Sequence, residues 1–418
     1  MLMLRATAGD EDQLSTLQQL RSNYSALEVN FLDKPSRVGE AVDLLVAAHS
    51  ADSLQRKLHR ARLNTSLLTD DVQREEQLQT WSRRQHDDSS AAHFIPLTRY
   101  HSLHEMDAYM KSLEKNFPRL ARVRRLGTTH NGLLISAVEI TTNVRNPYLE
   151  KPEILIEGGM HAREWIAPHV ALYIMSKLVG DFKRDGVIRK LVQKLRWIIL
   201  PTSNPDGYQH TWQARTIPRA AFWRKNRSPP ICHEAFPQRC CPGVDLNRNW
   251  NVEWGGPDTS EDPCSDVFPG PRPFSEPETR AIRDYVWPRR RRVKAFVSLH
   301  SYSQILAYSS AAFRGAYPSD VKDLERVGWE ARSALAKRYG TEYDVGSSAD
   351  ELYPASGTAL DWMKEKAGIK YAYLLELRPD KDHYNGLDAF FPSPELLLPT
   401  GRETWEAVRV IAAAALAH

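Results

Sequence analysis

A histidine and a glutamate three residues apart, His161 and Glu164, follow a short apolar run that two glycines interrupt. The run at 154–156 is typical of a buried strand, and Gly158 and Gly159 end it. Open α/β sheets bind ligands at the carboxyl ends of their strands, so the pair is expected at such a crevice. Imidazole nitrogen and carboxylate oxygen both bind zinc, and a catalytic zinc site uses three protein ligands and a water. A lone His-x-x-Glu is more often a hydrogen-bonded histidine beside a solvated glutamate, so the zinc interpretation needs a third ligand.

Two further residues of suitable chemistry occupy equivalent positions. His300 ends a predicted strand at 295–299, and Glu376 ends another at 371–375. His300 supplies the third ligand in type and in place. Once two histidines and one glutamate bind the metal, the remaining carboxylate is a natural general base. Four such side chains at three strand ends predict a catalytic metal centre.

Basic groups lie in loop-like stretches near these residues. Arg224 stands between Trp223 and Lys225, and Asn247 and Arg248 are consecutive. A guanidinium group binds a carboxylate through two parallel hydrogen bonds, and a buried one can stabilise an oxyanion. Taken singly, each arginine is more simply explained by a structural salt bridge.

The residues that carry this chemistry fall in a stretch where helical and strand patterns alternate, from residue 96 to the C-terminus. Apolar runs predict strands at 133–141, 153–157, 197–201, 296–299 and 371–375. Helices are predicted from a capping box at 102–105 to about residue 116, at 168–182, after 275–278 and after 400–403. The alternation predicts one large α/β domain with a mixed sheet flanked by helices.

Residues 1–80 show the separate pattern of a small α+β unit. Its expected elements are helices around 14–20 and 54–61 and strands at 27–31, 42–46 and 67–72. Since this unit has no cluster of histidine, cysteine and acidic residues, we expect a structural or regulatory role. The stretch 82–93 is polar, as linkers are, and Arg83-Arg84 within it is either a proteolytic site or part of an ordinary charged loop.

Composition excludes several classes of protein. The chain has 418 residues, 42% of them hydrophobic and 26% charged, which is ordinary for globular proteins and long for one domain. A net charge of +4 gives no argument for nucleic-acid binding. No apolar run reaches the roughly 18 residues that a membrane span needs. The apolar core at 1–8 is too short for a signal peptide, so either the chain is cytosolic or its leader is missing from this sequence.

Cysteines and arginines each form one local group. Cys232, Cys240, Cys241 and Cys264 share a short window without a Cys-x-x-Cys pair, so two disulfides fit better than a metal cluster or free thiols. Disulfides imply an oxidising compartment. Four consecutive arginines at 289–292 are best explained as a solvated surface turn, with a cleavage site or an anion-binding patch as alternatives.

As a set, these residues resemble the zinc metallocarboxypeptidases of the carboxypeptidase A type, with an activation prodomain. The matching motifs recur in family order over most of residues 96–415: His161-Ala-Arg-Glu164, Asn204-Pro-Asp-Gly-Tyr208, Phe222-Trp-Arg-Lys225, Val244-Asp-Leu-Asn-Arg-Asn-Trp250, Leu299-His-Ser-Tyr-Ser-Gln304, Tyr353-Pro-Ala-Ser-Gly357 and Leu375-Glu-Leu-Arg378. Residues 1–80 resemble the prodomain, notably at 34–39 and 68–72. The resemblance implies a prodomain at 1–80, an activation linker at 81–95 and a catalytic domain at 96–418 built on a mixed eight-stranded sheet.

The resemblance also implies the residues of the reaction. His161, Glu164 and His300 would bind one Zn²⁺, and Glu376 would take a proton from the zinc-bound water and return it to the leaving amine. Arg224 would stabilise the tetrahedral oxyanion.

Other residues would bind the substrate, which is the C-terminus of a peptide or protein. Asn247 and Arg248 would hold its terminal carboxylate, and Tyr353 would close over the terminal residue. Arg163 and Tyr302 would contact the substrate further back.

Leu360 occupies the position that resembles the family's specificity floor, where an aspartate would pair with a terminal lysine or arginine. Ala355 and Leu374 match other positions of the pocket and are apolar. Burying a leucine or phenylalanine side chain is worth roughly 1.5–3 kcal/mol, whereas burying an unpaired ammonium group costs several. We therefore expect apolar or aromatic C-terminal residues to be preferred.

Cys241 and Cys264 match the family's disulfide positions, which leaves Cys232 to pair with Cys240. The whole implies a monomeric, secreted zymogen that a protease activates by cutting near Arg84. Two alternatives are a non-catalytic binding protein that keeps the fold and a zinc deacylase of acylated amino acids. The first would most simply have lost Glu376, and the second would not need the carboxylate-binding residues.

The chain departs from the family pattern at three places. Ala221 replaces an arginine expected three residues before Arg224, and the turn at 379–386 is longer than the family's. Among the glycosylation acceptors at Asn23, Asn64 and Asn226, the last lies so close to Arg224 that we expect it to carry no glycan.

Overall fold

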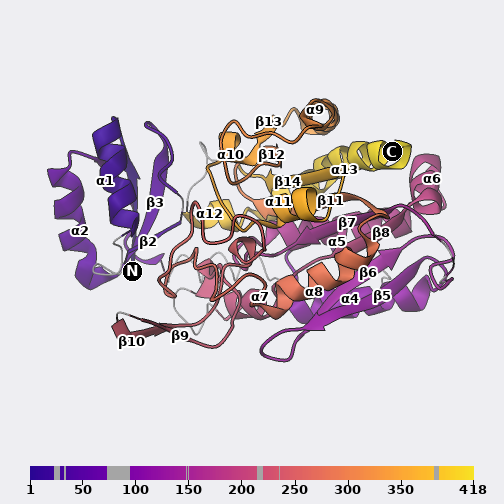
Figure 1. Ribbon diagram of the computed structural model, residues 1–418, viewed down its shortest axis with the longest axis horizontal. Helices are drawn as coiled ribbons and strands as arrows, with labels where there is room; N and C mark the ends of the chain where they lie inside the picture. Colours follow the sequence, from indigo (N-terminus) through magenta and orange to yellow (C-terminus); the bar gives the residue numbers. More distant parts are fainter. Residues whose placement is uncertain are drawn as a thin grey trace.

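The computed structural model describes residues 1–22, 29–32, 34–72, 95–146, 148, 150–213, 220–234, 236–380 and 386–418. A small N-terminal unit lies against one end of a larger domain, and the polypeptide of the larger domain alternates between strands and helices (Figure 1). The site expected at 83–84 lies outside the described residues. No helix in the described ranges is both long and apolar enough to cross a membrane.

The larger domain is built on a mixed eight-stranded sheet, as predicted, with strand order β13-β12-β14-β11-β7-β8-β6-β5. Its strands are β5 (Ala121–Thr128), β6 (Leu134–Ile140), β7 (Glu153–Gly158), β8 (Arg196–Leu200), β11 (Val293–Ser301), β12 (Ile305–Tyr308), β13 (Asp344–Ser347) and β14 (Tyr371–Leu377). The central strands β14, β11, β7 and β8 are mutually parallel, and β5, β6 and β12 each run antiparallel to a neighbour. The carboxyl ends of the four parallel strands therefore lie at the same edge of the sheet.

Both faces of this sheet are covered by helices. One face packs against α4 (Leu103–Asn116), α5 (Ile166–Gly180), α6 (Gly186–Lys194), α9 (Val321–Tyr339) and α13 (Pro394–Ala417). The other packs against α8 (Pro277–Val286), α11 (Ala359–Asp361) and η5 (Trp362–Lys366). Alternate residues of β7 pack against opposite faces of the sheet. Ile154 and Ile156 belong to the buried cluster on the first face, and Leu155 belongs to the cluster on the second. Each such side chain contributes about 1.5–3 kcal/mol when fully buried.

Shorter elements complete the larger domain and carry several of the site residues. They are α7 (Pro205–Thr211), η2 (Ala220–Phe222), β9 (Ile231–His233), β10 (Phe236–Cys241), η3 (Leu246–Arg248), η4 (Trp287–Arg289), α10 (Ser348–Glu351) and α12 (Gly386–Phe390).

Within its described residues, the N-terminal unit consists of a four-stranded antiparallel sheet, in the order β2-β3-β1-β4, and two helices. Its elements are β1 (Leu2–Thr7), α1 (Glu11–Ser22), β2 (Val29–Phe31), β3 (Ala41–Val46), α2 (Ala48–Arg60) and β4 (Asn64–Thr69). The stretch at 1–8, considered above only as a targeting segment, is an inner strand of this sheet. The last strand begins and ends three residues before the predicted 67–72.

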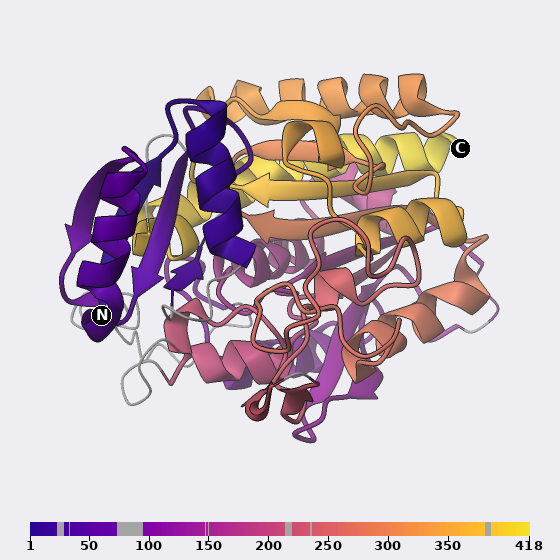
Figure 2. The ribbon, with the colours of Figure 1, turned by 60° about the vertical axis from the view of Figure 1, so that its left-hand side comes forward.

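The two faces of the small sheet have different partners. Leu4 and Leu44 pack with the helices of the small unit, whereas Met3 and Leu45, which alternate with them, belong to the buried cluster of the larger domain. The strands of the small unit consequently lie between their own helices and the larger domain (Figure 1). Figure 2, in which the small unit comes forward, shows it lying over one side of the larger domain.

Two predicted helix starts were wrong, and one was confirmed. Ser102 and Glu105 form the predicted capping box at the start of α4. The last helix begins at Pro394, so Thr400 lies inside it and its hydroxyl donates to the carbonyl of Leu396 at 2.6 Å. Glu276, rather than Ser275, is the N-cap residue of α8.

Candidate active site

Three buried side chains converge at the carboxyl edge of the sheet. His161 and Glu164 follow β7, and His300 lies near the end of β11, the parallel neighbour in which Leu299 is level with Gly158. His161 Nδ1 lies 2.7 Å from Glu164 Oε1, His300 Nδ1 lies 3.0 Å from Glu164 Oε2, and the two Nδ1 atoms are 3.1 Å apart. These residues form a group that could hold a metal ion.

The donor set and its spacing fit zinc. Zinc–ligand bonds near 2.0–2.1 Å place neighbouring donors of a tetrahedral site about 3.3 Å apart, close to the three separations above. Burial acts to lower the pKa of His300, but Glu164 outweighs it and the pKa is raised to about 9. Two imidazoles that face one carboxylate so closely are better satisfied by a shared cation than by a shared proton.

A second layer of polar groups fixes the two imidazoles. Asp245 Oδ1 lies 3.3 Å from His161 Nε2, and the Ser298 hydroxyl lies 2.9 Å from His300 Nε2. The same hydroxyl donates to buried Glu157 at 2.8 Å. Such partners set the orientation of metal-binding histidines and raise their basicity. Asp245 lies within a quoted motif and Ser298 two residues before His300, but neither could be assigned this role without its contact.

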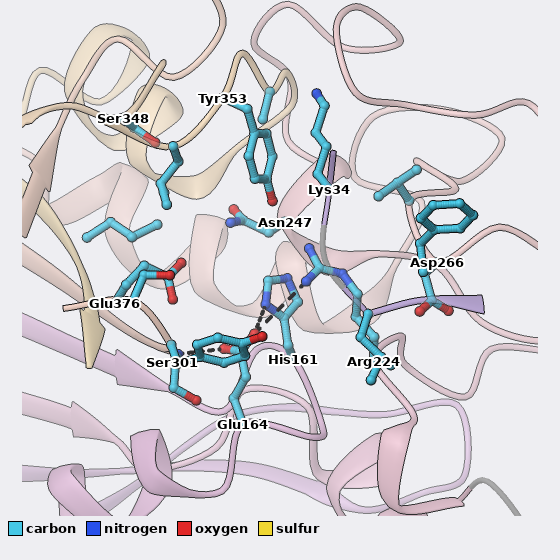
Figure 3. Close-up of a pocket in the computed structure, with 18 of the residues that line it drawn as sticks. Lys34, His161, Glu164, Arg224, Asn247, Asp266, Ser301, Ser348, Tyr353 and Glu376 are labelled. Carbon is cyan, nitrogen blue, oxygen red and sulfur yellow. Dashed lines mark hydrogen bonds and ion pairs between the residues drawn. The ribbon is translucent and has the colours of Figure 1, made fainter. Parts of the chain in front are cut away.

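Glu376 lies beside the three converging residues. In the parallel pairing of β11 with β14 it is level with His300, and its carboxylate lines the same cavity (Figure 3). Burial raises its pKa to about 8, although His300 and Arg224 oppose the shift. A dication held by the three residues would lower this pKa again, because positive charge favours the carboxylate. A carboxyl group whose pKa can be moved across neutrality suits general acid–base work.

Arg224 reaches the cavity from the opposite side. Its Nε and Nη2 donate to Asp245 Oδ2 at 3.0 and 2.9 Å, and its Nη1 lies 4.0 Å from Glu164 Oε1. Burial acts to lower the pKa of Arg224, but Asp245 raises it further, so the group stays charged. Asp245 therefore orients both His161 and the cation that faces the metal site.

Asn247 and Arg248 lie on η3, at the inner end of the cavity. The side-chain oxygen of Asn247 accepts a hydrogen bond from the Ala359 amide at 2.9 Å, which leaves its NH₂ group for a ligand. Arg248 donates through Nη2 to Asp258 Oδ2 at 2.6 Å and through Nη1 to the Asn247 carbonyl at 2.8 Å. The second hydrogens of both Nη atoms can still reach a carboxylate.

The innermost part of the cavity is apolar. Leu360, Leu374 and Ala355 line it, and the exposed fractions of their side chains are 1%, 5% and 6%. Tyr353 lies at its border with Asn247 and Arg248 (Figure 3). All the residues predicted to bind metal or substrate thus gather around one cavity of about 360 Å³.

Arg163 and Tyr302 also line the cavity, together with Phe390. The Arg163 guanidinium is 4.5 Å from the centre of the Phe390 ring and 3.2 Å from Asp266. The Tyr302 ring packs edge-on against Phe390 at 5.2 Å.

The N-terminal unit closes the cavity and makes contact with its polar residues. Lys34 Nζ lies 4.5 Å from the centre of the Tyr353 ring, and the Leu32 carbonyl accepts a hydrogen bond from Arg163 at 3.2 Å. Lys34 and Arg21 approach Asp258 Oδ1 at 3.1 and 2.8 Å. Burial alone would raise the pKa of Asp258, but Arg21, Arg248 and Lys34 hold it below its usual range.

Asp258 was not foreseen from the sequence. It is 99% buried at the side chain and is shared by Arg248 and two cations of the N-terminal unit. Nothing in the local sequence, Gly255-Gly-Pro-Asp-Thr259, distinguishes this carboxylate from one in a solvated loop.

The four cysteines pair as predicted, and Asn226 is buried, in agreement with the expectation that it carries no glycan. Disulfides join Cys232 to Cys240 and Cys241 to Cys264. Asn226 is fully buried, and its side-chain NH₂ donates to Glu276 and Glu278 at 2.7 and 3.0 Å. It cannot carry a glycan while this packing is intact.

Comparison with known proteins defines the class to which this site belongs. Residues 106–407 match the family described as "Zinc carboxypeptidase". The chain therefore belongs to the zinc carboxypeptidases, which are metallopeptidases that use Zn²⁺. Residues 4–79 match "Carboxypeptidase activation peptide", so the chain carries the propeptide of a zymogen.

Relatives and solved structures agree with this assignment. Carboxypeptidase B of Astacus astacus is 36% identical over 315 residues, which cover 75% of this chain and 96% of that protein. Zinc carboxypeptidase A 1 of Anopheles gambiae is 32% identical over 411 residues, covering 97% and 87%. The structure of carboxypeptidase A from Helicoverpa armigera has a TM-score of 0.85 at 28% identity and covers 100% of this chain and 97% of its own. Because the relatives bear both A and B names, their names do not fix the preferred C-terminal residue.

Proposed function

We propose that this chain is a secreted zymogen whose active form removes apolar or aromatic residues from the C-termini of peptides and proteins. One observation carries the proposal. A single cavity brings together a three-ligand metal group, the carboxylate of Glu376, the guanidinium groups of Arg224 and Arg248, and an apolar inner wall. Each part has a use in the hydrolysis of a terminal peptide bond, and the parts lie in the order that this substrate requires.

Zn²⁺ bound by His161, Glu164 and His300 supplies a Lewis acid that polarises the carbonyl and lowers the pKa of water toward about 7. In our proposal Glu376 accepts a proton as the water oxygen attacks the carbonyl carbon of the last peptide bond. Arg224 stabilises the negative charge that develops on the carbonyl oxygen. Glu376 then gives the proton to the amide nitrogen as the C–N bond breaks, so that a free amine and a free carboxylate leave.

Asn247 and Arg248 restrict the reaction to the last peptide bond. The contacts of both residues leave NH₂ hydrogens that would hold a carboxylate between the metal group and the apolar wall. An internal segment of a peptide has no carboxylate to place there, so its binding would leave these buried donors unpaired. Tyr353 would cover the bound residue, and Arg163 and Tyr302 would contact the preceding ones.

The apolar wall supports the proposed preference. Leu360 and Leu374 are almost fully buried at the end of the cavity. Burial of an aromatic or aliphatic side chain against them is worth about 1.5–3 kcal/mol, and a terminal ammonium group would find no carboxylate partner on either residue.

The contacts of the N-terminal unit support latency before activation. Lys34 lies over Tyr353, and the Leu32 carbonyl accepts from Arg163, so the unit occupies positions that a substrate needs. We propose a prodomain at 1–80, a linker at 81–95 and a catalytic domain at 96–418, and that a protease cutting near Arg84 releases a monomeric enzyme. The two disulfides fit an oxidising, extracellular compartment.

The test compares the purified chain before and after trypsin treatment, with release of C-terminal phenylalanine or lysine from blocked dipeptides as the readout. We expect release of phenylalanine only after the cut, faster than release of lysine, and none from Glu376→Gln. Faster lysine release would overturn the preference alone. Full activity of the uncut chain would overturn latency and leave the reaction intact.

A further inference from the structure

A second pocket lies at the opposite edge of the catalytic sheet from the active site. It occupies about 380 Å³ where β7, β8 and β11 begin, whereas the metal group lies where β7 and β11 end. The intervening length of β7 is roughly 20 Å. Seven arginines line this pocket, which we call the arginine pocket: Arg122, Arg124, Arg125, Arg145, Arg196, Arg289 and Arg292.

Two buried glutamates hold some of these arginines in place. Glu139 receives Arg124 at 2.5 Å and also pairs with Arg196. Glu153 lies 3.6 Å from Arg292. The side chains of both glutamates are almost fully buried, with exposed fractions of 1% and 3%. They fix the direction of the guanidinium groups around the pocket.

The charge of the pocket is not balanced. Seven guanidinium groups and two carboxylates give the lining an excess of five positive charges, although Glu114 and Glu150, outside the lining, pair with Arg145 and Arg292 at 3.2 and 3.7 Å. Burial and the proximity of Arg124, Arg292 and Arg289 lower the pKa of Arg196, although Tyr285 opposes the shift. Within the described residues, the side chains of Arg122 and Arg125 make no hydrogen bond or ion pair, and that of Arg145 has only Glu114, at 3.2 Å. Such a concentration of like charge favours binding of an anion.

The turn of four arginines at 289–292 contributes two side chains to this pocket and therefore does not lie wholly in solvent. Arg289 packs 4.4 Å from the centre of the Tyr285 ring, and Arg292 turns toward Glu153, so both line the pocket. Arg290 packs on Trp287 at 4.5 Å, and Arg291 is exposed, so both lie outside it. The positive charge therefore continues from the pocket along the adjoining surface.

We propose that the arginine pocket and the turn at 289–292 bind a sulfated polysaccharide chain. The planar guanidinium fork matches the oxygens of a sulfate group through two parallel hydrogen bonds. A flexible chain can place one sulfate in the concave pocket and others on the exposed arginines, so that several weak contacts act together. A flat membrane cannot enter the pocket. The two disulfides indicate an oxidising compartment, where sulfated polysaccharides rather than nucleic acids are the expected polyanions.

This interaction would retain the enzyme on a polyanionic matrix without changing its chemistry. Since the pocket and the metal group lie at opposite ends of the same strands, a chain bound at one leaves the other open to substrate. Binding is expected to weaken steeply as salt is added, because the contacts are largely electrostatic and partly exposed.

The test uses the full chain and a fluorescent heparin-derived oligosaccharide, with anisotropy measured over a range of salt concentrations. The variant Arg122→Gln/Arg125→Gln/Arg145→Gln removes three charges from the pocket. The matched control Arg326→Gln/Lys337→Gln/Arg338→Gln removes three exposed charges from α9 on another part of the surface. At about 0.15 M salt we expect the pocket variant to bind about tenfold more weakly or worse, with a shallower salt dependence, and the control to bind within about twofold of wild type.

Equal binding by the pocket variant, or an equal loss in the control, would overturn the proposal. So would equally tight binding of duplex DNA of similar charge, or of vesicles of anionic lipid, because either would show attraction to any polyanion. Competition by inorganic sulfate at micromolar concentration would show a site for the free ion and also overturn it.

If the glutamine variant has a lowered thermal midpoint, its loss of binding could reflect partial unfolding. The charge-conserving variant Arg122→Lys/Arg125→Lys/Arg145→Lys then tests the proposal. A site that uses guanidinium forks predicts binding several-fold weaker than wild type at unchanged net charge. Binding equal to wild type would overturn the proposal. Hydrolysis by the trypsin-treated enzyme should be unchanged in all these variants.

Discussion

Latency should depend on two cations of the prodomain and one carboxylate of the catalytic domain. Arg21 and Lys34 converge on Asp258, which also pairs with Arg248, the residue proposed to bind the substrate carboxylate. The variant Arg21→Gln/Lys34→Gln removes both prodomain charges. Arg248 remains to neutralise Asp258, so the catalytic domain should stay folded and competent.

The free energy that these ion pairs contribute to prodomain docking depends on how well the three side chains are shielded from water. The exposed side-chain fractions are 26% for Arg21, 20% for Lys34 and 1% for Asp258. Such pairs lie between exposed ion pairs, worth about 0–1 kcal/mol, and fully buried ones, whose loss costs about 3–5 kcal/mol. Burial lowers the pKa of Lys34, so part of its attraction is offset by desolvation. We therefore expect the double variant to weaken docking of the prodomain by about 2–4 kcal/mol, or roughly 30- to 1,000-fold.

The assay is residual hydrolysis of a blocked C-terminal phenylalanine substrate by uncut chain, as a fraction of the activity after trypsin. The open fraction should rise by the factor above until it approaches one. Arg56→Gln/Lys57→Gln on α2 removes the same charge from an exposed face of the prodomain and should leave residual activity at the wild-type level. Unchanged residual activity in the Arg21/Lys34 variant would refute the reasoning, because the prodomain would then be held by its other contacts, which include apolar packing and the hydrogen bonds of Leu32 and Arg37.

Three further changes test the site and its surroundings. Leu360→Asp should lower kcat/KM for terminal phenylalanine and raise it for terminal lysine, shifting their ratio by about 100-fold or more, since about 1.5–3 kcal/mol of apolar burial is lost and an ion pair is gained. Asp245→Asn should lower zinc affinity about 10- to 100-fold, measured by competition with a chelator, because His161 loses its carboxylate partner. Burial raises the pKa of Glu278 to about 8, so wild-type stability should fall as pH rises from about 4.5 to 8, and Glu278→Gln should reduce this loss in thermal unfolding.

The sign of the last effect follows from proton binding. Glu278 keeps its proton in the folded protein up to about pH 8 but loses it in the unfolded chain near about 4.3, so rising pH between these values favours unfolding. The same pH dependence in wild type and variant would contradict this account. Unaltered chelator competition in Asp245→Asn, or an unchanged phenylalanine-to-lysine ratio in Leu360→Asp, would contradict the other two predictions.

The arrangement of the metal group could be predicted because its residues lie at or after the carboxyl ends of strands that can be recognised in the sequence. His161 and His300 each follow or end an apolar strand, and parallel neighbours in one sheet bring such ends together. Glu376 follows the same rule on β14. The partners of these residues could not be predicted in this way. Asp245 lies 84 residues from His161 along the chain, and only the folded loops bring the two within contact.

The errors have local physical causes. The sequence at 400–403 has the form of a capping box, but Pro394 takes the first turn of the helix and the chain passes through Pro399 without ending it. A proline inside a helix is normally disruptive by about 3 kcal/mol, so packing of α13 against α9 and α5 outweighs a local preference. The first strand was missed because its apolar residues stand at the start of the chain, where they were assessed only as a targeting segment, and because its pairing with β3 and β4 is non-local.

One buried carboxylate couples two equilibria. Asp258 links the cations of the prodomain to Arg248, so binding of a free carboxylate at Arg248 and docking of the prodomain act on the same ion-pair cluster. Thermodynamic linkage then requires that each change the affinity of the other by the same factor. An amino acid released by the enzyme, or a competitive inhibitor with a free carboxylate, would therefore change how tightly the prodomain is held in molecules that are still uncut.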